Sequence, residues 1–141
     1  MRGDRTKEKG CIGELRVMYE AAKRGYGVLT PHGDFAKYDL VVDRNGKLEK
    51  VQVKAVTPVG DKLEVHTKSM SFDNSQDTNN RSKQNKYSSG DFDWLAVYDL
   101  TNHNVYFIPA EEIFGRSAYT LRLSSNNRLA SSRLASDYVD W

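Results

Sequence analysis

The stretch YDLVVDRNGKLEKVQVKAV, residues 38–56, contains two runs rich in Val and Leu, with Asn45 and Gly46 between them. Asn-Gly is the strongest two-residue signal for a tight hairpin turn. The stretch therefore predicts two antiparallel strands, over 38–42 and 48–56. Each predicted strand also carries charged or amide side chains, which a strand buried on both faces would not contain.

The register of this hairpin follows from its turn. With Asn-Gly at the centre of the turn, Arg44 faces Lys47, and the same register places Asp39 opposite Gln52. Directly opposed residues project from the same face of a sheet, and Lys54, two residues beyond Gln52, shares that face. The hairpin therefore has one apolar face and one face that carries a carboxylate, an amide and an ammonium group.

This polar face has a possible chemistry. A hard cation such as Mg²⁺ takes oxygen ligands, here the Asp39 carboxylate, the Gln52 amide oxygen and the backbone carbonyl of Val53. Lys54 could orient or deprotonate an attacking water, or stabilise charge on a phosphate. Glu14 could reach the metal directly or through water. Metal-assisted attack of water on a phosphodiester suits such a site. The alternative is that these side chains simply face solvent on an edge hairpin.

The segment before the hairpin predicts a helix. In KGCIGELRVMYEAAKRGYG, residues 9–27, apolar residues recur at spacings of three and four, and Gly25 is a natural stop signal. The predicted apolar face consists of Ile12, Leu15, Met18, Tyr19 and Ala22. The residues predicted on other faces are Glu14, Arg16, Glu20 and Lys23.

Further strands are predicted over 27–31, 62–67, 93–100, 104–109 and 119–123, with one helical turn over 110–115. Residues 68–91 have no period and are rich in Ser, Asn and Asp, which predicts a long exposed loop. The tail, 124–141, is weakly periodic and is compatible with a short helix or a loop. The order predicts an α/β fold with one mixed central β-sheet flanked by helices.

Composition restricts the class of protein. The chain has 141 residues, 38% hydrophobic and 28% charged, as expected of one folded domain. It has no apolar run long enough to span a membrane, and its first ten residues lack the apolar centre of a signal peptide. The lone Cys11 excludes an internal disulfide and is compatible with a reducing cytoplasm. Three scattered histidines make a structural zinc site unexpected.

Basic residues gather in two segments although the net charge is only +2. Such segments are typical of a polyanion partner, although a solvated face or a subunit interface would look similar. The loop at about 68–90 and the C-terminal segment at about 116–141 are the candidates. The residues expected to contact such a polyanion are Lys68, Arg81, Lys83, Lys86, Tyr87, Arg122, Arg128 and Arg133.

With Glu14, Asp39 and the QVK motif at 52–54 in this order, the sequence resembles the PD-(D/E)XK nuclease superfamily. Residues 9–56 and 91–115 are similar to small endonucleases that include group I intron-encoded homing enzymes, and the layout is also similar to archaeal-type Holliday junction resolvases. The resemblance implies a restriction-endonuclease-like core. It also implies that Glu14 and Asp39 assist or hold the metal and that Lys54 is the catalytic lysine. Gln52 stands at the usual acidic position, and Tyr38 replaces the motif's proline.

The resemblance implies a single nuclease domain over 1–141 that cuts double-stranded DNA at a specific site with Mg²⁺, for which Mn²⁺ is expected to substitute. Cutting both strands calls for two active sites, so a homo-oligomer, dimer or tetramer, is expected in the cytoplasm of a bacterial or phage-infected cell. The alternatives are a Holliday junction resolvase and a catalytically inactive DNA-binding protein. The amide of Gln52 motivates the last, because an amide binds a dication less strongly than a carboxylate does.

Overall fold

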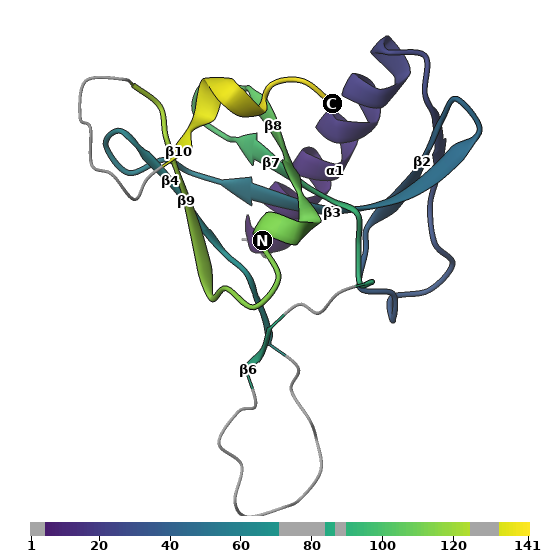
Figure 1. Cartoon of the computed structure of the whole chain (residues 1–141), viewed down its shortest axis with the longest axis horizontal. Helices are drawn as coiled ribbons and strands as arrows, with labels where there is room; N and C mark the ends of the chain where they lie inside the picture. Colours follow the sequence, from purple (N-terminus) through teal and green to yellow (C-terminus); the bar gives the residue numbers. More distant parts are fainter. Residues whose placement is uncertain (1–4, 71–83, 87–89, 125–132) are drawn as a thin grey trace, which may run out of the picture.

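A five-stranded mixed sheet forms the centre of the computed structural model, which describes residues 5–70, 84–86, 90–124 and 133–141 (Figure 1). Its strand order is β1-β2-β3-β7-β8, in which only the β3–β7 pair is parallel. One face of the sheet packs on helix α1. The sheet strands and the helix are α1 (Arg5–Lys23), β1 (Gly27–Leu29), β2 (Leu40–Arg44), β3 (Lys47–Val56), β7 (Trp94–Asp99) and β8 (Val105–Pro109).

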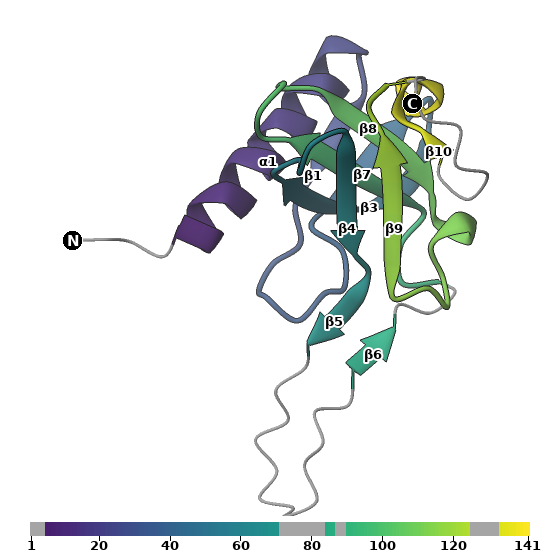
Figure 2. The ribbon, with the colours of Figure 1, turned by 90° about the vertical axis from the view of Figure 1, so that its left-hand side faces the viewer.

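The other face of the central sheet packs on a second, three-stranded sheet of order β10-β9-β4, as Figure 2 shows. Its strands are β4 (Lys62–His66), β9 (Ala118–Arg122) and β10 (Arg133–Leu134). Alternation along β7 serves both layers: Leu95 and Val97 face the second sheet, while Ala96 and Tyr98 face α1. The α/β class with a mixed sheet is confirmed. In the described part of the chain, however, a sheet rather than a second α-helix covers this face.

The predicted hairpin and its register are confirmed. The β2–β3 ladder pairs Arg44 with Lys47 and continues to Leu40 opposite Val51. Asn45 and Gly46 both have positive φ, 57° and 86°, as a two-residue turn of type I′ requires. The turn is also closed by the N–H of Gly46, which donates to Asp43 Oδ1 at 2.8 Å.

Helix α1 begins four residues before the predicted segment and ends as predicted. Gly25 has φ +78°, and its N–H donates to the carbonyl of Ala22 at 3.0 Å. The N–H of Tyr26 donates to the carbonyl of Ala21 at 2.9 Å. This pair of bonds is the Schellman motif, which needs a left-handed residue at Gly25.

The predicted apolar face of α1 is wrong except at Met18, which packs against the core. Ile12, Leu15 and Tyr19 are 49%, 59% and 54% exposed. The buried residues of the helix are Gly13, Val17, Glu20 and Ala21. Small side chains bring the helix axis close to the sheet, so the buried stripe is defined by steric fit more than by hydrophobicity.

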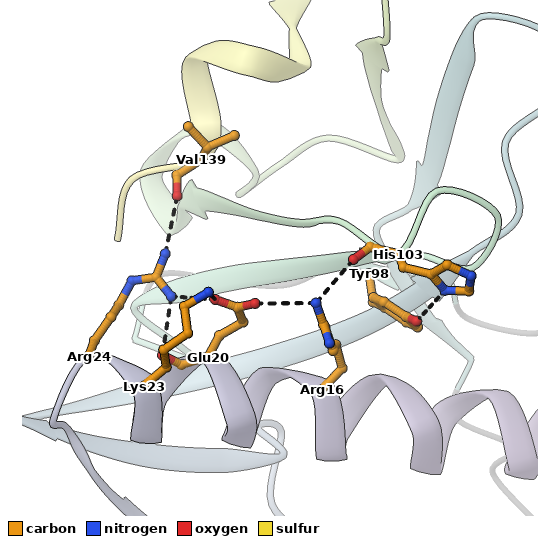
Figure 3. Close-up of polar contacts among 7 residues, drawn as sticks. All are labelled: Arg16, Glu20, Lys23, Arg24, Tyr98, His103 and Val139. Carbon is orange, nitrogen blue, oxygen red and sulfur yellow. Dashed lines mark hydrogen bonds and ion pairs between the residues drawn. The ribbon is translucent and has the colours of Figure 1, made fainter.

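Glu20, predicted on a polar face, is buried beside three cations, Arg16 and Lys23 of the same helix and Arg24 just after its end (Figure 3). Its carboxylate lies 2.6 Å from Arg24, 3.6 Å from Arg16 and 3.7 Å from Lys23. Arg24 also donates to the carbonyl of Val139 at 3.4 Å. The ion-pair cluster thus compensates the burial of the charge and links the end of α1 to the C-terminal segment.

The predicted loop at 68–91 contains strands. β5 (Lys68–Met70) pairs antiparallel with β6 (Gln84–Lys86), and these two strands project away from both sheets (Figure 2). The predicted helical turn is the 3₁₀ helix η1 (Ala110–Glu112), and the tail contains η2 (Ala135–Tyr138). No helix in the described ranges is long and apolar enough to cross a membrane.

Candidate active site

Asp39 lies immediately before β2 and is fastened to β3 on both sides of Gln52. Its N–H donates to the carbonyl of Val51 at 2.9 Å, and its Oδ2 accepts a hydrogen bond from the N–H of Val53 at 2.8 Å. The regular ladder ends at Leu40, one pair short of the predicted Asp39–Gln52 pair. The Asp39 side chain therefore links β3 to the start of β2 by a hydrogen bond where the backbone ladder ends. This hydrogen bond fixes the orientation of the carboxylate.

Gln52 and Lys54 lie half-buried on β3, in alternation with the buried Val51 and Val53. The alternation of a strand places both polar residues on the face opposite α1. Lys54 is an electrostatic neighbour of Asp39, because its charge lowers the pKa of that carboxyl. The hydrogen bond from Val53 acts in the same direction, but burial has the larger effect, and the pKa of Asp39 is raised.

Glu14 reaches the site because α1 crosses β3 at Gly13. A Cβ atom at Gly13 would lie 3.1 Å from the Cβ of Ala55 and 3.4 Å from Cγ1 of Val53. The sequence places Glu14 next to this contact. Burial raises the pKa of the Glu14 carboxyl, and the negative charge of Asp39 raises it further. The carboxylates of Glu14, on α1, and Asp39, just before β2, thus repel one another, and Lys54 lies near Asp39.

A pocket of about 320 Å³ opens beside these carboxylates. It lies between α1 and the segment that connects β1 to β2, and Glu14 and Asp39 both line it. The other lining residues are Thr30, Pro31, Gly33, Asp34, Ala36 and Tyr38. Asp34 was not predicted as a site residue. Pro31 and Gly33, which precede it in the segment between β1 and β2, are the sequence signal that marks this turn.

The residues present fit a hydrated dication better than a closed metal cage. In the described ranges, no three His, Cys, Asp or Glu side chains gather to hold a metal. Mg²⁺ typically takes one or two carboxylates and keeps several waters, which two acids and an amide can satisfy. A cation would also relieve the repulsion that raises the pKa of Glu14, because positive charge favours the ionised carboxylates.

The four predicted DNA-contacting residues that the structure describes lie on two different pairs of strands. Lys68 and Lys86 are direct partners across the β5–β6 pair. Arg122 lies half-buried in β9, and Arg133 lies 3.7 Å from Glu112 in an ion pair, with its guanidinium over the ring of Tyr119. The residues that lie outside the described ranges are Arg81, Lys83, Tyr87 and Arg128.

Known proteins resemble the chain in sequence and in structure. The profile of the PD-(D/E)XK endonuclease family matches residues 4–140. Protein 5.3 of Escherichia phage T7 is 33% identical over 113 residues, which are 77% of this chain and 84% of that protein. The structure of a bacterial homing endonuclease, I-Ssp6803I, superposes with a TM-score of 0.76 and 29% identity, over 96% of this chain and 88% of that one.

Proposed function

The chain belongs to the PD-(D/E)XK endonuclease family, and from this premise we propose that it is a Mg²⁺-dependent endonuclease that hydrolyses phosphodiester bonds of double-stranded DNA at a specific site. The observation that carries the proposal is the attachment of Asp39 to the backbone on both sides of Gln52, with Glu14 and Lys54 as electrostatic neighbours. The homing endonuclease similar in structure supports the specific-site part of the proposal.

Each residue then has a defined role. Asp39, the Gln52 amide and the carbonyl of Val53 would hold the metal, and Glu14 of α1 would assist. When bound, Mg²⁺ supplies charge stabilisation at the phosphate and makes a bound water more acidic. Lys54, whose positive charge acts on Asp39, would orient the attacking water or stabilise charge on the phosphate. The hydrogen bond from Val53 keeps the Asp39 carboxylate in a single orientation, so little reorganisation is needed before reaction.

The proposal extends to how the chain contacts DNA. The family profile covers residues 4–140, which supports one nuclease domain for the whole chain. Lys68 and Lys86 are paired residues of β5 and β6, and this pair of strands is a proposed contact to the phosphates of DNA. Arg122 and the basic residues outside the described ranges are the other proposed contacts.

We also propose a homo-oligomer, a dimer or tetramer, since cleavage of two strands calls for two sites. The exposed apolar stripe of Ile12, Leu15 and Tyr19 on α1 supports this assembly, because contiguous apolar surface commonly marks a protein interface. Light scattering on the wild type and on Leu15→Lys tests it. A lower mass for the variant supports the interface, and a monomeric wild type contradicts it.

One experiment tests the nuclease proposal. Supercoiled plasmid, long linear duplex and a synthetic four-way junction are incubated with the protein in Mg²⁺, in Mn²⁺ and in EDTA. The proposal predicts discrete duplex products with either metal and none in EDTA. A strong preference for the junction would instead support the Holliday junction resolvase, which shares the chemistry.

Gln52 motivates the remaining alternative, a DNA-binding protein without catalysis. Lys54→Ala separates the two, with the exposed Lys62→Ala on β4 as a matched control. Loss of cleavage in the first variant and retention in the second supports catalysis at this site. DNA binding by the wild type without cleavage under any metal condition would support the inactive protein.

A further inference from the structure

Phe35 is an exposed aromatic ring at the rim of the candidate site. Among the described residues it is the most exposed large apolar side chain, at 86%. Asp34 and Ala36, its neighbours in sequence, both line the pocket that contains Glu14 and Asp39, whereas Phe35 does not. The ring therefore stands outside the pocket, on the segment that forms one of its walls.

The ring has a defined seat on this segment. Gly33 has φ +84°, and a Cβ atom there would lie 2.8 Å from Cε1 and 3.2 Å from Cδ1 of Phe35. The ring thus packs on the backbone at Gly33, in space that the side chain of any other residue at position 33 would occupy. Two further contacts anchor the segment: Lys37 lies 3.7 Å from Asp91, and Asp39 bonds to β3.

An exposed phenyl ring contributes almost nothing to folding, because its apolar surface stays in water. The same ring on a positioned segment can contribute to binding. Apolar side chains beside a nuclease site have one partner with a matching flat surface, the nucleobase, which becomes accessible when a base step is opened. The segment also projects toward the same end of the molecule as β5 and β6, the strands that carry Lys68 and Lys86 (Figure 1 and Figure 2).

We infer that Phe35 is a positioning residue that stacks on a nucleobase beside the cleaved phosphate and partly unstacks that base step. The inference rests on the proposed function, because it needs DNA in the pocket. The ring holds the DNA strand so that the cleaved phosphate lies beside Asp39 and Lys54. Opening the step also makes binding sensitive to sequence, since base steps differ in how readily they unstack.

The test begins with the cut mapped on plasmid DNA. Duplexes of that sequence are then made with 2-aminopurine at each position flanking the cut in turn, and binding is measured in the Lys54→Ala background so that the DNA stays intact. The variants are Phe35→Ala, Phe35→Trp and, as the matched control, Val59→Ala, whose side chain is 82% exposed and is not part of the site.

Phe35→Ala is expected to weaken duplex binding about 5- to 150-fold, the usual loss for one base–aromatic stack. Phe35→Trp should restore binding, and Val59→Ala should leave it unchanged. The 2-aminopurine emission should rise on binding at one flanking position, except in Phe35→Ala. A mismatch at that position should recover part of the affinity of Phe35→Ala, because the step is already open, and a purely structural role would not produce this rescue.

Two outcomes overturn the inference in different ways. If the wild type cuts duplex DNA but Phe35→Ala matches Val59→Ala in affinity and in emission, Phe35 does not stack on a base, and the proposed function still stands. If the wild type cuts no DNA with any metal, the proposed function fails, and the role of Phe35 fails with it.

Discussion

The close approach of α1 to β3 at Gly13 makes a specific prediction for Gly13→Ala. The added methyl would lie 3.1 Å from the Cβ of Ala55, while carbon atoms pack best at about 3.5–4.0 Å. Overpacking of this kind costs about 1–3 kcal/mol. Replacing Gly by Ala inside a helix stabilises the folded protein by about 0.5–1 kcal/mol. The free energy of unfolding should therefore fall by about 0–2.5 kcal/mol.

Activity should fall as well as stability. To accommodate the methyl, the helix must move away from the strand by several tenths of an ångström, and Glu14 is the next residue. A positional error of about 1 Å in a catalytic group can cost about 100-fold in rate, so we expect cleavage to fall about tenfold. Thermal denaturation and initial rates of plasmid cleavage in Mg²⁺ measure the two effects.

Gly10→Ala is the matched control, because a Cβ atom at Gly10 has no neighbour within 4 Å. It should raise the melting temperature by about 1–4 °C through helix propensity alone and leave activity intact. Ala55→Gly should partly rescue Gly13→Ala, with a coupling free energy of at least about 0.5 kcal/mol in a double-mutant cycle. If Gly13→Ala behaves like Gly10→Ala in both assays, the helix does not position Glu14 as described.

Three further predictions concern single side chains. Burial and the charge of Asp39 raise the pKa of Glu14, so this group's contribution to stability is present at acid pH and lost as pH rises through the raised pKa. Without divalent cations, the melting temperature of Glu14→Gln relative to that of the wild type should therefore rise from about pH 4 to about pH 8. A difference that stays constant with pH would argue against the raised pKa. Trp141→Ala should lower the free energy of unfolding by about 1–2 kcal/mol in urea denaturation, because it removes a ring stacked 4.4 Å from that of Phe107; an unchanged midpoint would contradict this packing. Gln52→Glu should retain plasmid cleavage and change the relative rates in Mg²⁺ and Mn²⁺; an inactive but folded variant would refute the ligand role of Gln52.

The hairpin could be predicted from the sequence because its signals are local. Asn45 and Gly46 specify the turn, the turn specifies the register, and the register brings Asp39 to the segment of Gln52. The predicted Asp39–Gln52 pair differs, since the Asp39 side chain accepts the hydrogen bond that a backbone carbonyl would accept in a regular ladder. The periodicity of the sequence does not indicate such a side-chain hydrogen bond.

The buried face of α1 could not be predicted from periodicity, because two faces of the helix compete. Leu15 and Tyr19 are more hydrophobic than Gly13, but only a residue without a side chain permits the approach to Ala55. Glu20 is buried although it is charged, and Arg16, Lys23 and Arg24 compensate it at helical spacing. These ion pairs are local, but the choice of the buried face depends on steric fit to the surface on which the helix packs.

The central claim is that the charge of Asp39 binds the metal that supports cleavage. Asp39→Asn tests it most directly, because the amide oxygen can still accept the hydrogen bond from Val53 while the charge is lost. We predict a fall of at least about 100-fold in the initial rate of plasmid cleavage in Mg²⁺, with the circular dichroism spectrum unchanged. A folded Asp39→Asn that cuts at nearly the wild-type rate would contradict the account.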